Sequence, residues 1–83
     1  MRDLRAEMDR IDAEIVELLK KRFRKAELIG EKKRLLHLKV EDKERDKEVL
    51  ENYERSADGE LEEGFIESLV ELILKYSKEV QKR

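Results

Sequence analysis

The sequence contains no cysteine and no proline, and it has only one histidine, two tyrosines and two phenylalanines. Without cysteine, neither a disulfide framework nor a thiolate metal site can form. The single His37 argues against a zinc site built by the protein alone. No segment is apolar over the length that a bilayer requires, and the N-terminus lacks the apolar region of a signal peptide. We therefore expect a cytoplasmic protein without a metal or a membrane partner.

Neither sign of charge predominates, although charged side chains are abundant. They make up 51% of the 83 residues, with 20 basic and 22 acidic side chains and a net charge of −2. A nucleic-acid binder would normally show a basic excess, so we expect no nucleic-acid partner. The length suits one domain, residues 1–83. A monomer of this size buries only about 60% of its unfolded surface, and 39% apolar residues is a thin supply for its core.

Apolar residues recur at spacings of three and four along three segments, which predicts three helices and an all-α fold. The predicted helices span residues 2–36, 43–56 and 60–81, with a connection at 37–41. Asp42 is a suitable N-cap for the second helix, and Asp58-Gly59 is a turn signal before the third.

The length of the first helix determines the expected architecture. A helix of this length is about 50 Å long, whereas a compact chain of this size has a radius of gyration of about 12 Å. The helix must project from the rest, and its projecting half still carries an apolar stripe. A second copy of the chain would cover that stripe, so we expect an intertwined homodimeric helical bundle. The stripe in that half consists of Leu4, Met8, Ile11, Ile15 and Leu18.

Two cations, Arg22 and Lys33, occupy positions on the apolar face of the first helix. They differ by only about 20° around the helix axis and about 16 Å along it. Burying an unpaired cation costs several kcal/mol, so an anion must meet them, either an internal carboxylate or a ligand. Long side chains that reach solvent from the edge of a core, or an ion-pair lattice, would also explain these positions.

Ser77 and Gln81 form a polar pair one turn apart on the third helix, and Ser77 interrupts its apolar stripe. Each alone is commonly a solvated residue near a helix end. Together with Arg22 and Lys33, they indicate a polar pocket that offers cations and neutral donors but no nucleophile–base pair. Such a pocket would bind an anion and stabilise charge rather than perform covalent or acid–base chemistry.

Four segments resemble the all-helical chorismate mutase family in its short stand-alone form. The polar spacings match without gaps from Arg5 to Asp46, and one residue is missing in the loop before the third helix. The resemblance implies the conversion of chorismate to prephenate, a pericyclic Claisen rearrangement of a dicarboxylate that needs no cofactor. The matching segments are LRAEMDRIDAEIVELLKKR at 4–22, AELIGEKKRL at 26–35, VEDKERD at 40–46 and FIESLVELILKYSKEVQ at 65–81.

The resemblance also implies a role for each matching polar residue. Lys33 and Gln81 are expected to be catalytic, because both would donate to the ether oxygen that becomes negative as the C–O bond breaks. The other residues are expected to bind substrate. The substrate carboxylates are expected to bind Arg22, Arg45 and Ser77, and Arg5 of the partner subunit. The ring hydroxyl is expected to bind Asp46 and Asp42, the latter partly through its backbone N–H.

Helix geometry independently tests whether Arg5 can reach the pocket of its own chain. Arg5 lies about 25 Å from Arg22 along the same helix and is turned by about 100°, so the two cannot share a pocket within one chain. A first-turn surface arginine paired with Glu7 or Asp9 is the alternative. Asp46 departs from the family, which usually has Glu there, and its side chain is one methylene shorter.

Two other functions fit part of the pattern. Isochorismate–pyruvate lyase shares the fold and much of the cationic pocket, although acids at both Asp42 and Asp46 favour the mutase modestly. A non-catalytic helical dimerisation module would share the stripe and the long helix. That module would tolerate alanine at Arg22, Lys33 and Gln81 without loss of function.

Overall fold

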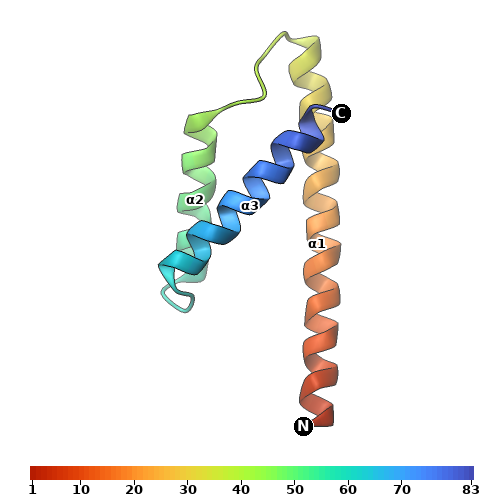
Figure 1. Ribbon diagram of the computed structural model, residues 1–83, viewed down its shortest axis with the longest axis vertical. Helices are drawn as coiled ribbons and strands as arrows, with labels where there is room; N and C mark the ends of the chain where they lie inside the picture. Colours follow the sequence, from red (N-terminus) through yellow and green to blue (C-terminus); the bar gives the residue numbers. More distant parts are fainter.

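The computed structural model describes all residues, 1–83, as three helices joined by two short connections (Figure 1). The helices are α1 (Arg2–Leu35), α2 (Lys43–Ala57) and α3 (Glu63–Gln81). This confirms the predicted all-α fold and two of the three predicted helices to within one residue. No helix contains an apolar stretch long enough to cross a membrane.

Helix α1 is a rod of 34 residues that is much longer than the rest of the molecule. It contains no proline, is rich in Glu, Lys, Arg and Leu, and carries Asp3 in its first turn and Lys32, Lys33 and Arg34 in its last. The molecule therefore measures 53 × 24 × 15 Å, with a radius of gyration of 15.4 Å. The expected projection of the first helix is confirmed.

Helix α1 ends because His37 adopts a left-handed backbone conformation, which the sequence did not predict. His37 has φ = 57°, and its N–H donates to the Arg34 carbonyl while the Leu38 N–H donates to Lys33. This is a Schellman arrangement, formed here without the usual glycine. Because it turns the chain sharply, residues 37–41 lead directly to the start of α2.

Asp42 caps α2 as predicted, since its side chain accepts a hydrogen bond from the Arg45 N–H. The predicted start of the third helix at Glu60 is three residues too early. Asp58 and Gly59 both have positive φ, and Glu62 is extended. The chain must leave this left-handed turn before helical geometry can resume, so α3 begins at Glu63.

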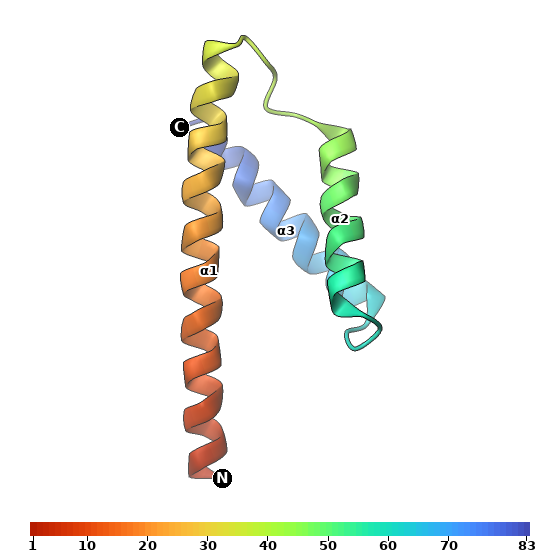
Figure 2. The ribbon, with the colours of Figure 1, turned by 180° about the vertical axis from the view of Figure 1, so that it is seen from behind.

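Helix α3 crosses between the other two helices and packs against both, whereas α1 and α2 do not pack against each other (Figures 1 and 2). On the α2 side, Val49, Ile66 and Val70 form the core. On the α1 side, the Phe23 and Tyr76 rings meet edge to face with centroids 4.6 Å apart. Ile66 and Val70 belong to the apolar stripe of α3, and Tyr76 lies next to it. Because both contacts use side chains of α3, that helix holds the fold together.

The N-terminal half of α1 contacts neither of the other helices and stands away from them (Figure 2). Its apolar stripe is uncovered, and its five members are each about half exposed or more. The exposed fractions are 62% for Leu4, 61% for Met8, 55% for Ile11, 49% for Ile15 and 63% for Leu18.

Candidate active site

A cavity of about 350 Å³ lies between the C-terminal half of α1, the start of α2 and the end of α3. Its walls are part apolar and part polar, and the apolar part includes Ala26, Ile29 and Leu74. Seven of the eight residues predicted for the site line this one cavity. They are Arg22, Lys33, Asp42, Arg45, Asp46, Ser77 and Gln81.

Arg22 and Ser77 connect α1 to α3 at one side of the cavity. The Arg22 guanidinium donates a hydrogen bond of 2.6 Å to Ser77 Oγ, and Ser77 is only 4% exposed. The serine that interrupts the apolar stripe of α3 therefore has a polar partner. This contact fixes the Arg22 side chain toward the interior of the chain, as the position of the residue on α1 predicts.

Lys33 is partly buried and points toward the connection between α1 and α2. Its Nζ donates a 2.9 Å hydrogen bond to the Val40 carbonyl, which also lies at the cavity wall. An ammonium has three N–H donors, so this contact leaves two for a ligand.

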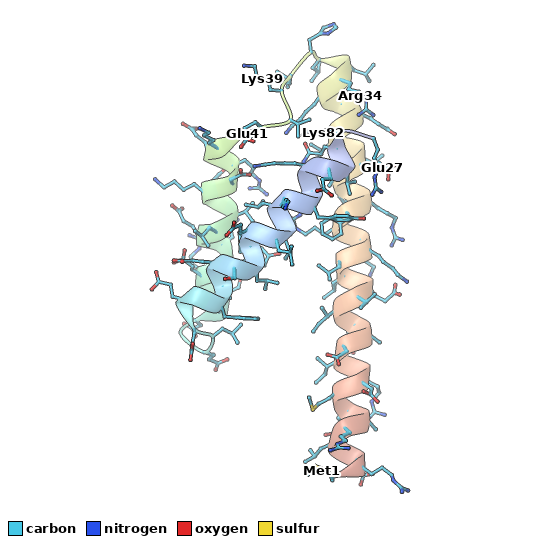
Figure 3. The ribbon with its side chains drawn as sticks, viewed as in Figure 1. Met1, Glu27, Arg34, Lys39, Glu41 and Lys82 are labelled. Carbon is cyan, nitrogen blue, oxygen red and sulfur yellow. The ribbon has the colours of Figure 1, made fainter.

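Gln81 is held by a close approach of α3 to α1 at Gly30. A Cβ atom added to Gly30 would lie 2.7 Å from the Gln81 Cα and still closer to the Gln81 carbonyl oxygen. Arg34 secures the same point, because its guanidinium donates a 2.9 Å hydrogen bond to that carbonyl. Figure 3 shows Arg34 and Lys82 where α1 and the end of α3 meet. Gly30 is thus required by packing, a reason that its position in the sequence does not reveal.

The Gln81 amide has one buried and one accessible end. Neither Oε1 nor Nε2 has a hydrogen-bond partner within the chain. Oε1 is buried, and Nε2 is not. Gln81 lines the cavity, so a free N–H donor is available to whatever occupies that space.

Arg45 lies at the open side of the cavity. Its guanidinium is 3.9 Å from Glu48, and both side chains are about three-fifths exposed. Exposed pairs at this distance contribute little, so the guanidinium can leave Glu48 for a stronger anion.

Lys78 also lines the cavity, although sequence reasoning did not single it out. Its ammonium donates to Asp46 Oδ2 at 2.8 Å and to Glu41 Oε1 at 2.9 Å. The hydrogen bond to Asp46, followed by that to Glu41, raises the pKa of Lys78 above its ordinary value. Leu74, Ser77, Lys78 and Gln81 have the spacing of one helix face, so the pattern that selected Ser77 and Gln81 could also have selected Lys78.

The cavity is strongly cationic in a chain whose net charge is −2. Five basic and two acidic side chains line it, so positive charges exceed negative ones by three. No group of three or more acidic, histidine or cysteine side chains is placed to hold a metal ion. The lining therefore suits a small dianion, with neutral donors placed beside the cations. The basic residues are Arg22, Lys25, Lys33, Arg45 and Lys78, and the acidic ones are Asp42 and Asp46.

Arg5 is the one predicted site residue that does not line the cavity. It lies in the first turns of α1, at the far end of the molecule, and it is exposed. The structure therefore agrees with the geometric argument that Arg5 and Arg22 of one chain cannot share a pocket.

The family of the chain follows from its sequence. The model of the family described as chorismate mutase type II matches residues 4–82, a range that contains all eight predicted site residues. Searches among curated proteins and among solved structures gave no significant match. None of the comparisons supports the lyase or the non-catalytic module. The match confirms the resemblance read from the four segments, and the chain belongs to the chorismate mutase type II family.

Proposed function

We propose that the cavity between the three helices is where this chorismate mutase binds chorismate and converts it to prephenate. The observation that supports the proposal is the meeting of Arg22, Lys33, Ser77 and Gln81, from opposite ends of the sequence, in one cationic cavity. The reaction breaks an ether C–O bond and forms a C–C bond within one molecule. It transfers no proton and needs no nucleophile, which fits a lining that contains cations and neutral donors.

The carboxylates of the substrate bind to the cationic side chains. Arg22 is already oriented by Ser77, so the substrate does not have to fix this side chain when it binds. Arg45 turns from its weak contact with Glu48 to a carboxylate. Together these residues hold the substrate in the folded, chair-like conformer from which the rearrangement proceeds.

Lys33 and Gln81 stabilise the charge that develops on the ether oxygen. Lys33 keeps its hydrogen bond to Val40 and uses a second N–H on the oxygen, and Gln81 donates from Nε2. The Lys33 ammonium is held by the Val40 carbonyl, and the Gln81 backbone is held by Gly30 and Arg34, before the reaction begins. Donors that are positioned in advance lower a barrier most.

Asp42 and Asp46 recognise the ring hydroxyl. The carboxylate of Asp42 caps α2 through Oδ1 alone, so its available groups are Oδ2 and the backbone N–H, which donates to no acceptor within the chain. Asp46 accepts from Lys78 through Oδ2, while Oδ1 has no partner in the chain. The hydroxyl therefore donates to Asp46 and accepts from the Asp42 N–H.

The active unit is a homodimer in which the partner's Arg5 completes each cavity. Its support is the uncovered stripe on the N-terminal half of α1, whose members are 49% to 63% exposed. At about 25 cal/mol per Å², covering such a stripe is a strong driving force for association. An antiparallel pair of α1 helices would bring the first turn of one chain near the cavity of the other.

The test follows the loss of chorismate absorbance with purified protein, and compares Lys33→Ala with Lys32→Ala. Lys32 is exposed and lies outside the cavity, so Lys32→Ala removes the same charge from the same helix without changing the cavity. We expect kcat to fall about 100- to 1,000-fold for Lys33→Ala and to stay unchanged for Lys32→Ala. An inactive unmutated protein, or an active Lys33→Ala variant, would contradict the proposal. Pyruvate release from isochorismate, measured in parallel, tests the lyase reaction.

A further inference from the structure

Lys78 joins α3 to two acidic residues near the start of α2. Its contact with Asp46 is the more protected one, because the side chains of Lys78 and Asp46 are 27% and 26% exposed, whereas that of Glu41 is 54% exposed. Glu41 lies in the connection just before α2 (Figure 3). The Lys78–Asp46 pair is thus the stronger link, and the Glu41 contact supports it from the solvent side.

The same pair separates two spaces. A second cavity, of about 760 Å³, lies between α2 and α3, and Asp46, Leu74 and Lys78 line both cavities. The Lys78–Asp46 contact therefore stands in the wall between the proposed active site and an outer groove. A change in this contact alters the shape of the active cavity as well as its charge.

We propose that Lys78 is a positioning residue that holds the Asp46 carboxylate against the ring hydroxyl of the substrate. The inference rests on the proposed function of the cavity. Lys78 binds one oxygen of Asp46 and leaves the other free, so it sets the direction in which the free oxygen points. A short aspartate side chain has few rotamers, and a single fixed oxygen is enough to orient it.

Lys78 also offsets negative charge beside a cavity that receives a dianion. Without its ammonium, the Asp46 carboxylate, which lines the cavity, would face the approaching substrate without a partner, whereas Glu41 lies outside the cavity lining. The ammonium is itself satisfied by these two acids, so it does not compete with Arg22 or Lys33 for the substrate carboxylates.

These two effects predict a change in substrate binding rather than in the chemical step. The ring hydroxyl takes no part in bond breaking, so its contact with Asp46 is equally strong in the ground state and the transition state. Loss of such a contact raises KM and leaves kcat nearly unchanged.

The experiment is a double-mutant cycle on the full chain with Lys78→Gln, Asp46→Asn and the double variant, with chorismate as the substrate. We expect Lys78→Gln to raise KM about tenfold with kcat within about threefold of the unmutated protein. In the Asp46→Asn background the same substitution should change KM less than twofold, because Lys78 acts through Asp46. Lys78→Arg should restore most of the binding, since it keeps the charge and can still reach Asp46.

Lys75→Gln is the matched control, because Lys75 is an exposed lysine on α3 outside the active cavity. It should leave KM and kcat unchanged. Thermal unfolding of each variant reports whether its fold is intact, and Lys78→Met, which keeps the aliphatic part of the side chain, replaces Lys78→Gln if that variant does not fold.

The inference is overturned if Lys78→Gln raises KM equally in the presence and absence of the Asp46 carboxylate. It is also overturned if the variant loses thermal stability and kcat together while KM stays the same, which would indicate a purely structural role. Either result leaves the proposed function standing when the unmutated protein is active and Lys33→Ala is not.

Discussion

The two halves of α1 have the same kind of apolar stripe but opposite surroundings. In the C-terminal half, Ala26 is 5% exposed and Gly30 lies against the backbone of α3. In the N-terminal half, Leu4 and Leu18 are more than 60% exposed and no other helix is in contact. One half is covered within the chain, and the other has no covering surface within the chain.

This difference teaches that an apolar pattern indicates that a face will be covered but not what covers it. The predicted site residues on α1 follow the same division. Arg22 and Lys33, in the covered half, meet α3 and the connection to α2. Arg5, in the uncovered half, meets neither, and its expected site lies in the second chain.

Charging the uncovered half should have the largest effect. We expect Ile11→Glu to abolish both the dimer and the activity, because the dimer interface would have to bury an unpaired carboxylate at a cost of several kcal/mol. Ala13→Glu places the same charge on the opposite side of α1 and should be tolerated. Light scattering after size exclusion gives the mass of each variant. A fully active monomer of Ile11→Glu would show that the stripe is not an interface.

Filling the close approach in the covered half should have the next largest effect. Gly30→Ala gains up to about 1 kcal/mol of helix propensity. It should nevertheless lose about 1 to 3 kcal/mol of stability, because the new Cβ meets the Gln81 backbone, which cannot move aside cheaply. Displacing Gln81 should lower kcat about 100-fold.

Gly64→Ala is the control for this substitution, because a Cβ there has nothing within 4 Å. It should be neutral or slightly stabilising in urea unfolding. Equal behaviour of the two alanine variants would show that the approach of α1 and α3 is loose.

The ion pairs of Lys78 should give a smaller, pH-dependent effect. Contact with Asp46 and then Glu41 raises the pKa of Lys78 above its ordinary value of 10.5. Because the folded-state pKa is the higher one, the stabilisation is complete below the unfolded-state pKa and is lost as the pH rises through the folded-state pKa. The difference in unfolding free energy between the unmutated protein and Lys78→Gln should be about 1 kcal/mol at pH 8.

Urea unfolding at a series of pH values measures this difference. It should stay constant from about pH 7 to 9 and shrink above about pH 10. A difference that grows with rising pH would contradict the assignment.

The smallest effect is expected for Asp46→Glu. The added methylene extends the reach of the carboxylate, and Lys78 has a flexible stem that can follow it, so turnover should be equal or better. Steady-state kinetics with chorismate measures it. A large loss would show that the cavity is built around the shorter acid.

Much of the fold could be predicted from the sequence, because the helices are long and strongly periodic. Ser77 and Val80 are buried as the stripe of α3 predicts, and Asp42 caps α2. The sequence-based helix limits differ from the structure where a local backbone conformation, rather than the apolar pattern, sets the end of a helix. His37 ends α1 in a left-handed conformation, and the turn at Asp58 and Gly59 delays α3 to Glu63.

Seven residues predicted from the sequence line one cavity in the structure, but the contacts that hold them there could not be predicted. Arg22 and Lys33 are conspicuous because they are charged residues on an apolar face. Lys78 is not conspicuous in a chain with 51% charged residues, because only the structure shows that its ammonium bridges Asp46 and Glu41. The need for glycine at position 30 is equally hidden in the sequence, since it arises from contact with the α3 backbone about fifty residues later. The catalytic and binding roles stay predictions.

Mixed dimers test most directly the central claim, that the uncovered half of α1 completes the cavity of a second chain. Arg5→Ala and Lys33→Ala chains with different tags are refolded together, and the dimer that carries both tags is isolated. One of its two cavities has both defects and the other has none, so it should recover about half of the unmutated activity while each parent dimer stays inactive. A mixed dimer no more active than its parents would show that Arg5 does not serve the partner's cavity.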